Sequence, residues 1–147
     1  MDEQLGRQIE LGYAGKVDSS DAYAALSSDR DAVLVDVRTS AEWSHVGQPD
    51  LGQIGKPVIF LEWQRFPDGA LNGQFIEQLR EAGVRQGIPV YFLCRSGARS
   101  AAAAKAATDA GLGPAYNVSD GFEGPPGRDG RRTVSGWKSG GLPWRQA

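Results

Sequence analysis

The 147-residue chain has little of several features on which other functions depend. It contains one cysteine, so no disulfide can form within the chain, and this favours a reducing, cytoplasmic location. The single histidine and the single cysteine lie far apart, which leaves no cluster with the spacing of a zinc site. We therefore expect no metal and no other cofactor. The net charge of −2 provides no basic field for nucleic acid, and no nucleic-acid partner is expected.

Long apolar runs are also missing. No stretch could cross a bilayer, and the first residues lack the basic and then apolar pattern of a secretory signal, so no membrane partner is expected. What is present is a globular composition, with 40% hydrophobic and 23% charged residues. The length suits one domain with one core. We assign residues 16–147 to this domain and the polar residues 1–15 to a weakly ordered segment or an element at its edge.

Short apolar runs alternate with helical patterns along the chain. Helices are predicted from the Asp18–Ser20 region to Leu26, from Thr39 with Glu42 in a capping box, from an Asn72 cap to Gly83, and over 99–110. The apolar runs predict strands at 32–37, 58–61, 89–93 (with proline at the first position) and 115–118. Strands that alternate with helices indicate an α/β domain with a mainly parallel sheet.

Two segments carry many glycines and prolines. Residues 45–57 are predicted to form a long connection, and residues 120–147 an irregular tail that wraps the domain. The tail contains four apolar residues that could anchor it to the core, namely Phe122, Trp137, Leu142 and Trp144.

The most informative segment surrounds the only cysteine. The run 89–93 ends at Cys94, and a short loop leads directly into an alanine-rich helix. A thiol is a good nucleophile only when it is ionised. Backbone N–H groups of the loop, the helix N-terminus and two arginines would favour the thiolate and hold an anion beside it. We take Cys94 as the catalytic nucleophile, and as anion-binding residues Arg95, Ser96, Gly97, Ala98, Arg99 and Ser100.

The charge around this loop supports that interpretation. No acidic residue occurs between Ala82 and Thr108, so nothing nearby in sequence cancels the field of Arg95 and Arg99. The alternative is that Cys94 is a small core residue, because free cysteine is often buried. A core cysteine does not need two arginines and a glycine in the next five positions, and we favour the nucleophile.

A second candidate pair stands at the end of the run 32–37. Asp36 and Arg38 could shape the active site, since sites in parallel sheets lie beyond the carboxyl ends of strands. We favour a structural role for them, in which the carboxylate and the guanidinium pair and fix the loops at the strand ends.

Four segments together resemble the rhodanese-like sulfurtransferase family. They are Asp36-Val37-Arg38 with Glu42-Trp43, the loop from Cys94 to Ser100, Asp120-Gly121-Phe122-Glu123-Gly124, and Gly136-Trp137 with Gly141-Leu142-Pro143-Trp144. The resemblance covers most of the chain. It implies a single domain with a mainly parallel central sheet of about five strands, flanked by helices on both faces.

The same resemblance implies a thiosulfate sulfurtransferase activity. Cys94 would take sulfane sulfur from a donor such as thiosulfate, hold it as a persulfide, and pass it to a nucleophile such as cyanide or a thiol. The acceptor could also be a protein. Two arginines suit an anionic donor, and covalent catalysis in two half-reactions predicts ping-pong kinetics.

Two other functions remain open on sequence alone. Phosphatases and arsenate reductases also use a cysteine and an arginine in one loop, usually with five residues between them. Four residues separate Cys94 from Arg99, and the smaller loop favours sulfur over a tetrahedral oxyanion. The second alternative is a non-catalytic redox-sensing or binding module that uses a reactive cysteine.

Overall fold

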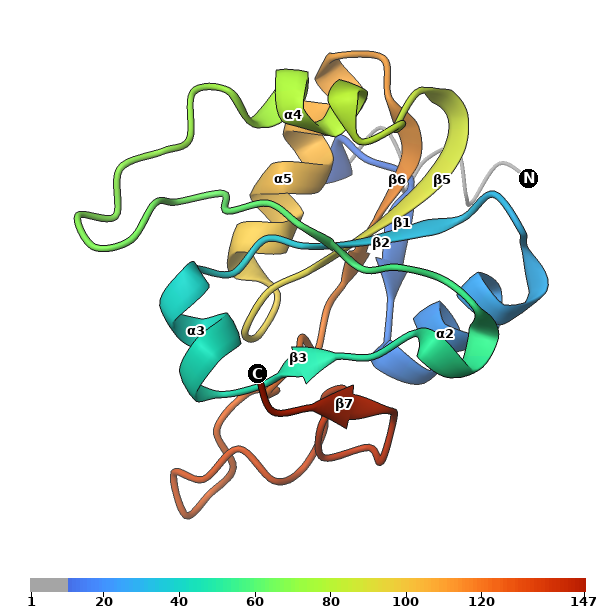
Figure 1. The fold of residues 1–147 in the computed structure, drawn as a ribbon. Helices are drawn as coiled ribbons and strands as arrows, with labels where there is room; N and C mark the ends of the chain where they lie inside the picture. The colour runs from blue at the N-terminus through green and yellow to red at the C-terminus, as the bar shows by residue number, and fades with distance from the viewer. Residues whose placement is uncertain (1–10) are drawn as a thin grey trace.

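Figure 1 shows the computed structural model of the protein, which describes residues 11–147. Five parallel strands form the central sheet in the order β1-β6-β5-β2-β4. β5 therefore lies in the middle, and the carboxyl ends of all five strands lie along one edge. These strands are β1 (Gly15–Val17), β2 (Val33–Asp36), β4 (Ile59–Phe60), β5 (Gln86–Leu93) and β6 (Gly113–Val118).

Helices cover both faces of the sheet (Figure 1). α4 and α5 pack on one face, while α2 and the tail after β6 pack on the other. The prediction of an α/β domain with a parallel central sheet flanked by helices is confirmed. The helical segments are α2 (Ser19–Ser28), α3 (Ser40–His45), a 3-10 turn η1 (Gly52–Ile54), α4 (Phe75–Glu81) and α5 (Ala98–Asp109).

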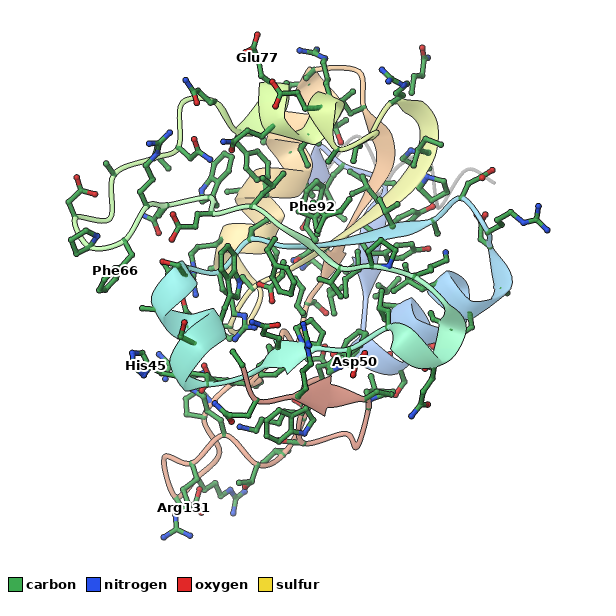
Figure 2. The ribbon with its side chains drawn as sticks, in the orientation of Figure 1. His45, Asp50, Phe66, Glu77, Phe92 and Arg131 are labelled. Carbon is green, nitrogen blue, oxygen red and sulfur yellow. The ribbon has the colours of Figure 1, made fainter. Side chains whose placement is uncertain are left out.

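The core is divided by the sheet, because successive side chains of a strand point to opposite faces. In β5, Val90 and Phe92 pack toward α4 and α5, and Figure 2 shows Phe92 in the middle of the molecule. Tyr91 and Leu93 pack toward α2 and the tail. A strand buried on both faces needs apolar residues at every position, which explains the continuous apolar run in the sequence.

Two predicted helix caps depend on residues close in sequence, and the structure confirms both. Asp18 caps α2 by accepting a hydrogen bond from the Asp21 amide. Thr39 and Glu42 form the predicted capping box of α3. Asn72 was predicted to cap α4, but the cap residue is Gln74. The Asn72 side chain instead accepts from the Gln74 amide in a turn that precedes the helix, because such a side chain can reach two residues ahead.

The start of β5 also differs from the prediction. The strand begins at Gln86, so Pro89 lies inside it rather than at its first position. The pairing of β5 with β6 shifts register between Gln86 and Val90. A proline lacks the N–H that a regular ladder uses, so an irregularity of this kind can accommodate it within a strand.

The long connection and the tail are less irregular than predicted. Residues 45–57 contain β3 (Gln48–Pro49) as well as η1, and the tail contains β7 (Trp144–Arg145). β3 and β7 pair antiparallel in a separate two-stranded sheet. Trp137 anchors the tail as expected, since it is fully buried and its indole N–H donates to the Pro143 carbonyl at 2.7 Å. The connection and the tail therefore hold each other at the carboxyl edge of the main sheet (Figure 1).

The first described residues lead directly into the sheet. Tyr13 and Ala14 are buried, and β1 is an edge strand that pairs with β6. The expectation of weak order for residues 1–10 concerns positions outside the described residues. Among residues 11–147, no helix has both the length and the apolar character that a membrane crossing requires.

Candidate active site

Cys94 lies at the carboxyl end of β5, the middle strand of the sheet. Its carbonyl accepts a hydrogen bond from the Phe122 amide at 2.8 Å, so the tail holds the beginning of the cysteine loop. The side chain of Cys94 is 1% exposed. A reagent therefore reaches the sulfur only when a loop or side chain that covers it moves.

Two hydrogen-bonding groups contact the Cys94 sulfur. The Gly97 amide donates to Sγ at 3.1 Å, and the Ser100 hydroxyl lies 3.1 Å from Sγ. The Ser100 oxygen is also 2.5 Å from Asn117 Oδ1, while the Asn117 amide nitrogen donates to the Gly97 carbonyl. Because Ser100 has one hydroxyl hydrogen, it can donate either to Asn117 or to the sulfur. A neutral thiol could donate to Ser100, whereas a thiolate requires the hydroxyl to turn toward it.

Two glycines permit the close packing of this loop. Gly97 has φ = 110°, and a Cβ there would lie 2.4 Å from the Ser119 carbonyl oxygen. Gly121 has φ = 71°, and a Cβ there would lie 2.4 Å from the Arg95 carbonyl oxygen. Both positions combine a left-handed backbone with contact against another chain segment, which only glycine accommodates without strain. The loop and the tail are therefore fixed against each other by their backbones.

Arg99 extends from the first turn of α5 to α3. Its guanidinium donates to both carboxylate oxygens of Glu42, at 2.7 and 3.0 Å, and both side chains are about four-fifths buried. Hydrogen bonding to Glu42 raises the pKa of Arg99 although burial lowers it, and the Glu42 and Cys94 charges add to the increase. Burial alone would raise the pKa of Glu42. The hydrogen bond and the charge of Arg99, together with the hydrogen bonds from Thr39, lower it by more, so the pKa lies below the ordinary value of 4.5.

Arg95 pairs with a residue of the tail. Its side chain is 49% exposed and lies 3.2 Å from the carboxylate of Glu123. No residue nearby in sequence opposes the two arginines, but the folded chain brings a carboxylate to each of them. Each arginine has a carboxylate partner that is distant in sequence, because the fold brings α3 and the tail to the loop. Neither Glu42 nor Glu123 is predicted in this role from the sequence.

The remaining loop residues do not contact the sulfur through their side chains. Ser96 and Ala98 are exposed. Ser100, which does contact the sulfur, is fully buried. Among the described residues, the Gly97 amide is the one backbone donor to Sγ, rather than the ring of amides that the loop sequence indicated. Asn117 was also missed. In the sequence, Asn117 is a polar residue within the predicted apolar strand 115–118. Its contact with Ser100 becomes evident only when β6 lies beside β5.

Asp36 and Arg38 form a fully buried pair beside the loop. The Arg38 guanidinium donates to Asp36 Oδ2 at 2.8 Å and to the Gly47 carbonyl at 2.8 Å, and it lies 4.2 Å from the centre of the Phe122 ring. The pair thus joins the end of β2, the 45–57 connection and the tail.

Within residues 11–147, histidine, cysteine, aspartate and glutamate side chains form no group of three that could hold a metal ion.

The fold and the position of the cysteine define the class of the protein. A rhodanese-like domain protein from Staphylococcus aureus shares this fold, with a TM-score of 0.54 at 15% identity, and the match covers 90% of this chain and 98% of that one. A polysulfide-sulfur transferase homodimer from Wolinella succinogenes is 26% identical to this chain, with a TM-score of 0.62. The match covers 99% of this chain and 90% of that one. The protein therefore has a rhodanese-like fold.

Closer relatives give the family. The model of the STR4 middle domain matches residues 14–147, and the chain belongs to this family. The crystal structure of Rv0390 from M. tuberculosis is 50% identical, with a TM-score of 0.84, and the match covers 92% of this chain and 99% of that one. An uncharacterized protein of Rickettsia conorii is 43% identical over 127 residues, which are 86% of this chain and 94% of the relative.

Proposed function

We propose that the protein is a sulfurtransferase in which Cys94 carries sulfane sulfur as a persulfide. The observation that supports this most is the contact of the Cys94 sulfur with the Gly97 amide and the Ser100 hydroxyl at the carboxyl end of the middle strand. Both groups can donate to an anionic sulfur. The likeness to a polysulfide-sulfur transferase points to the same chemistry.

In the first half-reaction, the Cys94 thiolate attacks the outer sulfur of a donor such as thiosulfate. A bond forms between the two sulfurs, the sulfur–sulfur bond of the donor breaks, and sulfite leaves with the electron pair. In the second half-reaction, a thiol or cyanide attacks the outer sulfur of the persulfide, and Cys94 leaves as the thiolate. The transferred sulfur keeps its oxidation state, so no oxidant or reductant is consumed.

Ser100 and Asn117 have a defined part in this cycle. When the thiol loses its proton, the Ser100 hydroxyl rotates from Asn117 toward the sulfur and stabilises the anion. Gly97 donates to the same atom throughout. Asn117 fixes the loop by its second contact, from its amide nitrogen to the Gly97 carbonyl at 3.1 Å.

The pairing of Arg99 argues against phosphate-ester hydrolysis. A phosphatase of this kind needs the loop guanidinium for its tetrahedral oxyanion, whereas the Arg99 guanidinium donates to both oxygens of Glu42. A donor would therefore meet a nearly neutral Arg99–Glu42 pair.

A thiolate nucleophile also depends on a reducing compartment, which supports a cytoplasmic location.

Intact-mass spectrometry tests the proposal. The protein is incubated with thiosulfate, freed of excess reagent and weighed, with Cys94→Ser as the matched control. We expect wild-type protein to gain the mass of one sulfur atom and to lose it again on addition of cyanide. An unchanged mass with thiosulfate and with an organic polysulfide, together with measurable phosphate-ester hydrolysis, would overturn it.

A further inference from the structure

A cleft of about 550 Å³ lies beside the cysteine loop. This volume is within the roughly 300–1,000 Å³ that small-molecule sites occupy. Its walls come from the tail and from one residue of the loop. The charged residues that line it are Arg95, Glu123, Arg131, Arg132 and Lys138.

The charge of this cleft is strongly one-sided. Four cations face one carboxylate, and that carboxylate, Glu123, pairs with Arg95. Arg131, Arg132 and Lys138 therefore remain as three positive charges in a protein whose net charge is −2. Asp129 is close in sequence and its carboxylate accepts from the backbone amide of Arg131, but it does not line the cleft. A ligand with two or more negative charges would compensate the three cations.

Two of the three cations are already held in place. Arg132 donates to the Gly124 carbonyl, and Lys138 donates to the Val46 carbonyl at 3.1 Å. The Lys138 ammonium also lies 4.1 Å from the centre of the Trp144 ring. A positioned cation loses less conformational freedom when it binds a ligand, which favours binding.

Arg131 differs from these two residues. Figure 2 shows it on a loop of the tail at the periphery of the molecule. Among the described residues, no hydrogen bond or ion pair engages its guanidinium. It can therefore close on an anion without breaking an existing contact.

The cleft is joined to the active site through Arg95. This residue follows Cys94 in the chain and lines the cleft. Its carbonyl accepts from the amides of Glu123 and Gly124, at 3.0 and 3.1 Å, so the wall of the cleft and the cysteine loop are one hydrogen-bonded unit. A ligand in the cleft can contact the cysteine loop at Arg95, the residue next to Cys94.

We propose that this cleft binds the acidic part of the sulfur acceptor, and that the acceptor is a small thiol with at least two carboxylate groups. The inference rests on the proposed function. The cleft is larger than an inorganic donor requires, and arginines bind carboxylates through paired hydrogen bonds. With its carboxylates in the cleft, and once the loop or side chain that covers Cys94 has moved, the acceptor thiolate attacks the outer sulfur of the persulfide. A sulfur–sulfur bond forms on the acceptor, and the Cys94 thiolate leaves with the electron pair.

Two thiols of similar size test the charge requirement. Mercaptosuccinate carries two carboxylates, whereas 1-thioglycerol carries none. The variants are Arg131→Gln and, as the matched control, Arg128→Gln, because Arg128 is an exposed arginine of the same loop that does not line the cleft. In thiosulfate turnover, we expect Arg131→Gln to lower kcat/KM for mercaptosuccinate by roughly tenfold, the loss expected for one charge-assisted contact. Turnover with 1-thioglycerol, and both thiols in Arg128→Gln, should change less than about twofold.

A binding measurement separates this inference from the proposed function. Calorimetric titration of Cys94→Ser with mercaptosuccinate needs no sulfur transfer, and Arg131→Gln in that background should weaken binding by roughly the same factor. Absence of binding, or equal binding by the Arg131 and Arg128 variants, overturns the cleft assignment even when the persulfide forms. Binding as expected without any persulfide would instead refute the proposed function and, with it, the acceptor role.

Discussion

The ion pair between Arg99 and Glu42 gives a prediction whose size and pH dependence both follow from the structure. Glu42→Gln removes the carboxylate charge but keeps a side chain that can complete the capping box of α3. The change therefore isolates the pairing with Arg99, which loses its carboxylate partner in a site where about a fifth of each side chain is exposed. Removing one partner of a fully buried pair costs about 3–5 kcal/mol, and we expect about 1–3 kcal/mol at this partly exposed site.

The pH dependence follows from the lowered pKa of Glu42. A carboxyl group whose pKa is lower in the folded than in the unfolded protein stabilises the fold fully above its unfolded value of 4.5. That stabilisation decreases as the pH falls below 4.5 and is lost below the folded pKa, where the carboxyl group is protonated in both states. The difference in free energy of unfolding between wild type and Glu42→Gln should thus be constant from pH 7 to about 5 and shrink below 4.5.

Urea denaturation followed by circular dichroism at a series of pH values measures this difference. Glu77→Gln is a suitable control, because Glu77 is an exposed residue in the first turn of α4 and Figure 2 shows it at the surface. Equal stabilities of wild type and Glu42→Gln at pH 7 would refute the reasoning. So would a difference that stays the same down to pH 3, because the charge would then have no part in it.

Three further substitutions test the loop and its support. Ser100→Ala should slow persulfide formation by roughly tenfold at unchanged circular dichroism, because the sulfur anion loses one of its two donors; an unchanged single-turnover rate would exclude that role. Gly97→Ala should destabilise the fold by about 1–3 kcal/mol in urea, since its Cβ would meet the Ser119 carbonyl at a left-handed φ; wild-type stability would show that the loop can relax. Asp36→Asn should cost about 3–5 kcal/mol by leaving the buried Arg38 charge unpaired, and a melting temperature equal to wild type would contradict this.

Features that depend on a few consecutive residues were predictable from the sequence. The capping box at Thr39, the buried apolar strands and the glycine between Cys94 and the helix are examples, because each needs only local geometry. Their order along the chain was enough to indicate the α/β class and to place Cys94 at a strand end. The resemblance to a known family added the number of strands.

Features that depend on contacts between distant segments were not predictable in this way. Glu42 and Glu123 reach the cysteine loop from α3 and from the tail, so a search for acidic residues near Cys94 in sequence could not find them. Asn117 contacts Ser100 only because β6 pairs with β5. The two-residue strands β3 and β7 are too short to show a periodic pattern, and each exists only through the other.

Position-labelled thiosulfate gives the most direct measurement of the central claim. The outer sulfur carries a heavy isotope, the protein is digested after the first half-reaction in the absence of acceptor, and the peptide that contains Cys94 is analysed by mass spectrometry. The account predicts the heavy sulfur on Cys94 and unlabelled sulfur in the released sulfite. A Cys94 peptide without added sulfur, or label that appears in the sulfite, would contradict it.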